Sequence, residues 1–261
     1  MNISLAHQHA VICGSTQGIG LASAIALASL GATCILIARN EEALKSAVEK
    51  LSAKHGQQHS YRVADFSRQG DVQKAIEDIT SNHSVTVLVN NTGGPKAGPI
   101  AEAVPETFSN AFQQHLICNQ ILVQAVLPGM KTAGYGRIIN IVSTSVRTPL
   151  ANLGVSNTIR AAVASWAKSL SNEVGQYNIT VNNVLPGLTN TARLQSLVQQ
   201  TAASQHNSAE TVEENMRSSV PMKRFGEAEE IANVVAFLAS PAASYVNGTS
   251  IPVDGGRTPT V

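Results

Sequence analysis

Short runs of apolar and β-branched residues alternate along the whole chain with longer segments in which apolar residues recur every three or four positions. The short runs have the length and composition of buried strands, and the longer segments have the period of amphipathic helices. Strands are predicted at residues 9–13, 33–38, 60–64, 85–89, 137–142, 179–184 and 250–253. Helices are predicted at residues 19–30, 41–54, 71–81, 106–131, 157–174 and 228–238.

This alternation of strands and helices predicts the fold class α/β. Strands that are apolar along their whole length are typical of a parallel sheet with helices on both faces. No linker or change of composition divides the 261 residues, 43% of which are hydrophobic, so we expect one domain with a sizeable core. The prediction is a single-domain Rossmann fold, a doubly wound parallel sheet of about seven strands, in which ligands bind at the carboxyl ends of the strands.

Residues 188–225 break the alternation. This stretch is rich in Gln, Ser, Thr and Asn and has weak helical periodicity. We interpret it as one or two short helices that form a polar substrate lid. The alternative is a disordered surface insertion.

The charge balance bears on the class of partner. The 18 Lys and Arg residues against 17 Asp and Glu give a net charge of +1, so no basic surface for nucleic acid or an anionic membrane is expected. Charged residues are only 13% of the chain, which favours a subunit interface. Glycines interrupt the uncharged first 38 residues before any apolar run reaches membrane-spanning length, so no membrane segment is predicted.

The cysteines and histidines give little sign of metal chemistry. Cys13, Cys34 and Cys118 lie among apolar residues, where a buried, reduced thiol is the default, and this predicts a cytoplasmic protein. His7 and His9 alternate before the first strand without a third ligand nearby, so no metal site is predicted.

A glycine-rich turn follows the first predicted strand and opens the first helix. Glycines there allow a tight turn and a close approach to a pyrophosphate, while free N–H groups and the helix dipole attract phosphates. Glycine turns after a strand also occur without a nucleotide, so the motif alone leaves the ligand open. The residues that would contact a dinucleotide are Gly14, Ser15, Thr16, Gln17, Gly18, Ile19 and Gly20.

The second predicted strand ends in Arg39 and Asn40, with no acidic residue. Dinucleotide folds place an acid at this level to bind the ribose of NAD, and an arginine to accept the additional phosphate of NADP. Arg39 therefore favours NADP(H) over NAD. The alternative is a solvated arginine at a strand end.

Further motifs complete a set that resembles the short-chain dehydrogenase/reductase family. They are Asn90-Asn91-Thr92-Gly93, Gly136-Arg-Ile-Ile-Asn-Ile-Val-Ser143, Thr180-Val-Asn-Asn-Val-Leu-Pro186-Gly187, Arg224-Phe-Gly-Glu227 and Val253-Asp254-Gly255-Gly256. With the glycine turn they span almost the whole chain. The chain most resembles the branch labelled 3-oxoacyl-acyl-carrier-protein reductase-like, which implies an NADPH-dependent reductase.

The resemblance also implies further cofactor contacts. By position, the adenine-side contacts fall on Asp65 and Phe66 after the third strand, although Asp65 could instead cap the following helix. The remaining implied contacts are Asn91, Thr92 and Gly93 after the fourth strand, and Pro186, Gly187 and Thr191, which match the segment that holds the nicotinamide amide.

The catalytic pattern departs from the family. The family uses Ser, Tyr and Lys, with the tyrosine thirteen residues after the serine and the lysine four further on; counting from Ser143 gives Ser156 and Arg160. A serine hydroxyl is too weak an acid to replace the tyrosine, and an arginine stays charged. Ser156 can donate a hydrogen bond, and Arg160 can bind the nicotinamide ribose or an anionic group of the substrate.

A fourth family position, an asparagine on the helix after Gly93, falls on His115, with Asn119 one turn away. Histidine has an ordinary pKa that suits acid catalysis at neutral pH. We therefore hypothesise that Ser143 and Ser156 polarise a carbonyl while His115 supplies the proton, directly or through water. The alternative is a histidine packed in the interior.

Two functions remain open, beside a third class, a reaction other than carbonyl reduction. The first is an NADPH-dependent reductase of a carbonyl compound, and the resemblance implies a 3-oxoacyl thioester. The second is an NADP(H)-binding protein of the same fold with weak or no catalysis, serving as a sensor or structural subunit. A small-molecule substrate and a homotetramer or homodimer are expected for the reductase, since residues 117–130 and 161–170 are apolar beyond one helical stripe.

Overall fold

The computed structural model describes residues 1–260 and contains the predicted parallel sheet. Each strand pairs in parallel with its neighbours, in the order β3-β2-β1-β4-β5-β6-β7. The order reverses between β1 and β4, which is where a sheet of this class binds its ligand. The strands are β1 His9–Cys13, β2 Thr33–Ala38, β3 Ser60–Val63, β4 Val85–Asn90, β5 Gly136–Ile141, β6 Ile179–Pro186 and β7 Ser250–Val253.

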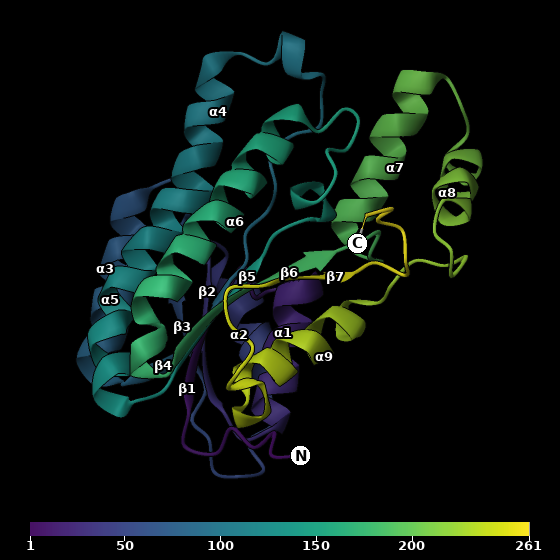
Figure 1. Cartoon of the computed structure of the whole chain (residues 1–261). Helices are drawn as coiled ribbons and strands as arrows, with labels where there is room; N and C mark the ends of the chain where they lie inside the picture. The colour runs from purple at the N-terminus through teal and green to yellow at the C-terminus, as the bar shows by residue number, and fades with distance from the viewer. Residues whose placement is uncertain (261) are drawn as a thin grey trace.

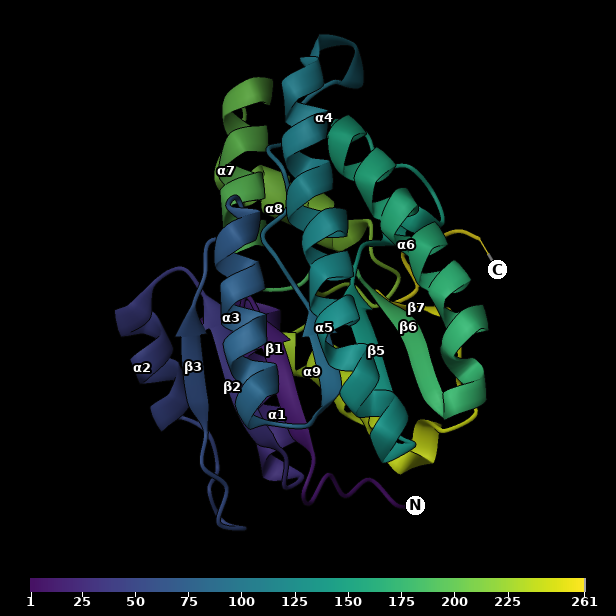
Figure 2. The ribbon, with the colours of Figure 1, turned by 90° about the vertical axis from the view of Figure 1, so that its left-hand side faces the viewer.

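The helices cover both faces of the sheet (Figures 1 and 2). One layer contains α1, α2 and α9, whose side chains pack with Ile12, Leu36 and Val89. The other contains α3, α5 and α6, which pack on the opposite side of the same strands. The helices are α1 Gly18–Ser29, α2 Glu41–Glu49, α3 Gln69–Asn82, α4 Pro105–Phe112, α5 Cys118–Ala133, α6 Gly154–Val174, α7 Ala192–Gln205, α8 Ala209–Ser218 and α9 Ala228–Ala239.

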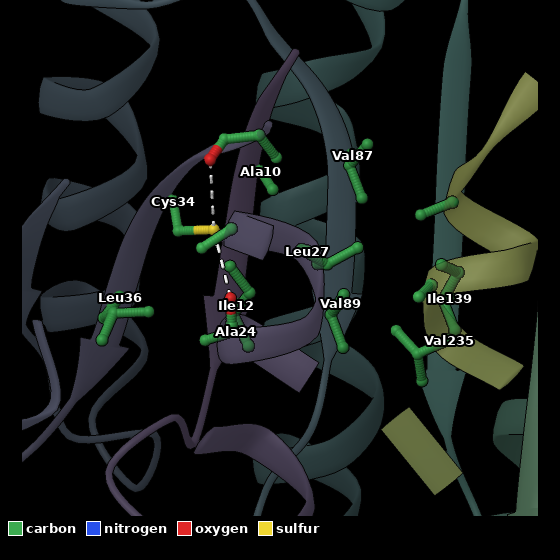
Figure 3. Packing of buried hydrophobic residues seen from close by; sticks show 14 of the residues in the cluster. Ala10, Ile12, Ala24, Leu27, Cys34, Leu36, Val87, Val89, Ile139 and Val235 are labelled. Carbon is green, nitrogen blue, oxygen red and sulfur yellow. Dashed lines mark hydrogen bonds between the residues drawn. The ribbon is translucent and has the colours of Figure 1, made fainter. Parts of the chain in front are cut away.

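Figure 3 shows the core between the sheet and the α1–α9 layer. Leu27 of α1 and Val235 of α9 lie against the strand residues Ile12, Val89 and Ile139, and all five are almost completely buried. Cys34 lies in this core, and Cys13 and Cys118 lie in the other. The structure confirms that the three thiols are buried and unpaired.

Two helix predictions were wrong in detail. The helix predicted at 41–54 ends at Glu49, because residues 53–56 are exposed and the segment after Leu51 is held instead by His59. The ring of His59 accepts a hydrogen bond from the N–H of Cys34 at 3.0 Å and contacts the carbonyl of Ser52 at 3.0 Å. The helix predicted at 106–131 is interrupted by a π-helical turn, Gln113–Ile117, between α4 and α5.

Residues 188–225 contain α7 and α8, which lie beyond the carboxyl ends of the strands (Figure 1). The two helices have their own small apolar cluster, formed by Leu194, Val198 and Ala202 of α7 with Val212 of α8. Within the described residues, no helix is both long and apolar enough to span a membrane.

Candidate active site

A cavity of about 470 Å³ lies at the carboxyl edge of the sheet, beneath α7. Its walls come from the segments that follow β1, β4, β5 and β6, because these strands are neighbours on either side of the point where the strand order reverses. The predicted site residues that line it are Gly14, Gln17, Gly18, Ile19, Asn91, Thr92, Gly93, Ser143, Ser156, Arg160, Pro186, Gly187 and Thr191.

The glycine turn has the geometry of a phosphate cradle. Gly14 has a φ of +57°, and a Cβ on it would lie 2.5 Å from the carbonyl oxygen of Asn91. Asn91 Nδ2 donates to the carbonyls of Cys13 and Gly14 at 3.3 and 3.1 Å, which fixes β4 against the turn. Gln17, at the start of α1, makes no side-chain cap, so the first N–H groups of the helix remain free for an anion. These features fit a dinucleotide pyrophosphate.

Several predicted cofactor residues lie outside the lining of the cavity. Ser15 is fully buried beside the carbonyl of Ile37, and Gly20 packs on Gly14, so both shape the turn rather than face the cavity. Thr16 is half-buried in the same turn.

The residues predicted on the adenine side lie at the ends of β2 and β3. Arg39 is exposed and forms no ion pair within residues 1–260, which leaves its guanidinium free for a phosphate. Asn40 caps α2 by accepting a hydrogen bond from the N–H of Ala43 at 2.9 Å. Asp65 accepts from the N–H and hydroxyl of Ser67, which lowers the pKa of its carboxyl. Phe66 packs against the core of the α3–α5–α6 layer.

The serines at the catalytic positions both line the cavity. Ser143 follows β5, and its Oγ accepts a hydrogen bond from the N–H of Ser145 at 3.1 Å. This bond occupies a lone pair and leaves the O–H of Ser143 available to donate into the cavity. Ser156 lies in the first turn of α6, which places a second hydroxyl on the same cavity wall.

Arg160 lies one helical turn after Ser156 and is only 8% exposed. Its Nη1 donates to the carbonyl of Ile141 at 2.9 Å, which holds the guanidinium at the end of β5. Burial, with a smaller contribution from the charge of Arg193, lowers the pKa of Arg160 to about 10. The side chain therefore stays positively charged at neutral pH.

The structure does not place His115 in the lining of the cavity. The imidazole is 2% exposed within the π-helical turn, and its Nδ1 shares a hydrogen bond of 2.6 Å with the hydroxyl of Thr92, which does line the cavity. Its Nε2 is buried without a partner. Burial, and then the charge of Arg160, lower the pKa of His115 to about 3. The imidazole is therefore neutral at pH 7, which does not fit direct proton donation by an imidazolium.

The sequence analysis missed several residues of the cavity. Arg193 is two residues after Thr191 and donates from Nη2 to the carbonyl of Pro95 at 2.7 Å. The spacing from Thr191 was the available signal, but the arginine lies in the stretch that was interpreted only as a polar lid. The other residues missed are Gly94, Ile141, Val142, Thr144, Leu150, Leu153, Leu188, Thr189, Asn190, Ala192, Leu194, Leu197 and Arg257. Within residues 1–260, no group of three His, Cys, Asp or Glu side chains could hold a metal ion.

A family model described as Enoyl-(Acyl carrier protein) reductase matches residues 14–258. The match covers the glycine turn, the cavity and residues 188–225 together. The chain belongs to this family, and thus to the short-chain dehydrogenase/reductases, whose members are oxidoreductases.

Similar proteins are related over nearly their whole length. The chain is 33% identical to the NADPH-dependent reductase BacG of Bacillus subtilis, over 95% of this chain and 96% of that protein. It is 34% identical to the 3-oxoacyl-acyl-carrier-protein reductase FabG of Pseudomonas aeruginosa, over 97% and 98%. The crystal structure of L-sorbose reductase from Gluconobacter frateurii, complexed with NADPH and L-sorbose, matches with a TM-score of 0.93 and 31% identity, covering 100% of both chains.

Proposed function

We propose that the protein is an NADPH-dependent reductase of a carbonyl compound with an altered proton donor. The observation that carries this proposal is one cavity that brings together the glycine turn, Thr191, and the hydroxyls of Ser143 and Ser156. A 3-oxoacyl thioester is the first substrate class to test, because FabG of Pseudomonas aeruginosa is named a 3-oxoacyl-acyl-carrier-protein reductase.

The cofactor is NADP(H). The free N–H groups at the start of α1 would hold the pyrophosphate, Arg39 would bind the ribose phosphate, and Thr191 would position the carboxamide. BacG is named as NADPH-dependent, and the L-sorbose reductase was crystallised with NADPH, which supports this choice. When bound, the nicotinamide supplies the hydride.

The chain's own residues would bind the carbonyl and manage the proton. Ser143 and Ser156 donate hydrogen bonds to the carbonyl oxygen, and these bonds strengthen as negative charge develops on it. Water in the cavity would be the source of the proton, and the Thr92 hydroxyl, held by Nδ1 of His115, would pass its own proton to the alkoxide while taking one from that water. In this relay the imidazole stays neutral, in agreement with its pKa of about 3.

A second candidate function is NADP(H) binding with little or no turnover. The observation in its favour is that the only ionisable side chains in the described lining of the cavity are arginines, a residue type that keeps its proton and does not act as a general acid. Such a protein would keep the cofactor contacts and lack the means to protonate the product.

The loss of NADPH absorbance with acetoacetyl thioesters and simple diketones tests the proposal. We expect turnover by the natural protein and an approximately 100- to 1000-fold lower kcat in Ser143→Ala, since one donor to the developing charge is lost. Ser145→Ala, a neighbouring buried serine outside the cavity lining, is the matched control and should keep its activity.

The Ser156→Tyr/Arg160→Lys double variant restores the family pattern and separates the two candidates. Turnover by the double variant alone, with NADP⁺ binding by both proteins, would favour the binding protein over the reductase.

We also propose that residues 188–225 form a lid over the substrate and that the chain assembles as a homodimer or homotetramer. Leu194 and Leu197 of α7 line the cavity, which supports the lid. Phe112 of α4 is 40% exposed at a groove that Phe108 and Ile159 also line, which supports an apolar subunit interface on α4 and α6.

A further inference from the structure

The charge of the cavity is unbalanced. Its lining contains Arg160, Arg193 and Arg257, and no Asp or Glu among the described residues. None of the three arginines forms an ion pair within residues 1–260. Arg160 is buried, and a buried charge is costly unless it is paired, so Arg160 calls for an anion supplied by a ligand.

Arg160 is the most buried of the three and makes one hydrogen bond, to the carbonyl of Ile141. A guanidinium carries five N–H donors in a planar fork, so the other donors remain for a ligand in the cavity. The fork matches the two oxygens of a carboxylate.

Arg193, in the first turn of α7, reaches the same point. The Nη2 atoms of Arg160 and Arg193 each lie 3.6 Å from the position that a Cβ on Gly94 would occupy. The two Nη2 atoms are therefore no farther apart than twice that distance, although both carry a positive charge. Repulsion between the two guanidiniums contributes to the lowered pKa of Arg160, and an anion between them would remove it. Gly94 leaves this space open.

The position of the two arginines indicates that the anion they bind belongs to the substrate rather than to the cofactor. Arg160 and Arg193 are held by the carbonyls of Ile141 and Pro95, and neither hydrogen bond involves the glycine turn that would hold the pyrophosphate. Arg160 also lies one helical turn from Ser156, so an anion there would be close to the reacting carbonyl. A phosphate on a carrier arm would be many bonds away from that carbonyl.

The rest of the cavity wall describes the body of the substrate. Leu150 and Leu153 lie before α6, and Leu194 and Leu197 face the cavity from α7. These four leucines would contact hydrocarbon, while the arginine pair would contact charge. We propose that Arg160 and Arg193 bind the carboxylate of an oxo acid with an apolar side chain, and that such acids are the substrate class of this reductase. This inference rests on the proposed function. It names oxo acids as the substrate class, in place of the thioesters that are tested first there.

Binding of a carboxylate that cannot be reduced separates the inference from catalysis. The probes are isocaproate and its neutral amide, added to the protein saturated with NADP⁺ and measured by calorimetry. We expect the carboxylate to bind and the amide to bind at least about tenfold more weakly, since a charge-assisted bidentate contact is lost. Equal binding of the two would overturn the inference.

Arg193→Gln tests the pair without the risk of unfolding that Arg160→Gln carries. It should weaken isocaproate binding about tenfold or more and leave the affinity for NADP⁺ unchanged. Lys96→Gln, which removes an exposed cation next to Pro95 and outside the lining, is the matched control and should bind isocaproate normally. If Arg193→Gln weakened NADP⁺ binding instead, the pair would serve a cofactor phosphate and the inference would fail.

Activity then distinguishes the two proposals. The inference predicts that ketoisocaproate is reduced with a higher kcat/KM than its methyl ester. Equal reduction of acid and ester would overturn the inference and leave the reductase in place. Arginine-dependent binding of isocaproate with no reduction of any carbonyl compound would overturn the proposed function and leave the anion site in place.

Discussion

His115 shows how surroundings change the chemistry that a residue type suggests. Its position after Gly93 and its ordinary pKa of 6.5 made it the natural candidate for a proton donor. In the structure, burial inside the π-helical turn and the nearby charge of Arg160 favour the neutral imidazole. The family position predicted His115 near the site, and its hydrogen bond to Thr92 brings it next to the cavity lining, but its protonation state depends on packing that no sequence pattern records.

The depressed pKa of His115 predicts a pH dependence of stability. The folded state stays neutral at His115 down to about pH 3, whereas the unfolded state takes up a proton below its pKa of 6.5. Stability from this group is therefore complete above pH 6.5 and is lost as pH falls from 6.5 toward 3, at about 1.4 kcal/mol per pH unit. Urea unfolding of His115→Gln across this range should show a shallower loss of stability than the natural protein.

The control for that experiment is His206→Asn. His206 is exposed and has a φ of +51° that asparagine tolerates, so this variant should follow the pH dependence of the natural protein. Parallel curves for His115→Gln and the natural protein would contradict the assigned cause.

At the scale of elements, the proposed lid, residues 188–225, forms a separate structural unit. Its two ends lie side by side, with the N–H of Asn190 bonded to the carbonyl of Gly226 at 2.7 Å and the N–H of Gly226 bonded to Leu188 at 2.9 Å. Between these bonds, α7 and α8 bury a few apolar residues mainly against each other. Because this core is so small, the free energy of local unfolding should be lower for this unit than for the sheet.

Hydrogen exchange tests the lid. We expect the amides of α7 and α8 to exchange faster than those of β1, β4 and β5, and to slow when NADP⁺ is added because Thr191 begins the lid. The amides of α3, which lie away from the cavity, should keep their rates. Exchange in α7 as slow as in β4 without cofactor would mean that the lid does not open on its own.

The elements also show what the sequence can and cannot predict. The predicted strands lie within about two residues of the observed ones, because a strand buried on both faces is an unbroken apolar run. The end of α2 was missed because the loop that follows it is held by the two ring nitrogens of His59. No periodic pattern in the sequence records these contacts. The π-helical turn was missed because it has no breaking Gly or Pro; its extra residue is accommodated by packing against Thr92 and α6.

At the scale of the whole molecule, topology explains which site residues were predictable. Residues at the carboxyl ends of β1, β4, β5 and β6, or just after them, meet at one edge, so Gly14, Asn91, Ser143 and Pro186 could be placed together from the sheet order alone. Arg193 could not, because its position depends on how α7 packs on this edge. The arginine that we propose to bind the substrate therefore lies in the least predictable part of the chain.

The exposed groove between α4 and α6 carries the prediction on assembly. Phe112 and Phe108 present aromatic surface there, and apolar surface of this kind is normally covered by another chain. We expect light scattering to give twice or four times the mass of the chain, and Phe112→Glu to shift the protein to monomer because a charge would have to be buried. Val63→Glu, which adds the same charge at an exposed position of the edge strand β3, should leave the assembly intact. A monomer in the natural protein would mean that the groove serves another purpose, while an unchanged oligomer in Phe112→Glu would place the subunit contact on another face.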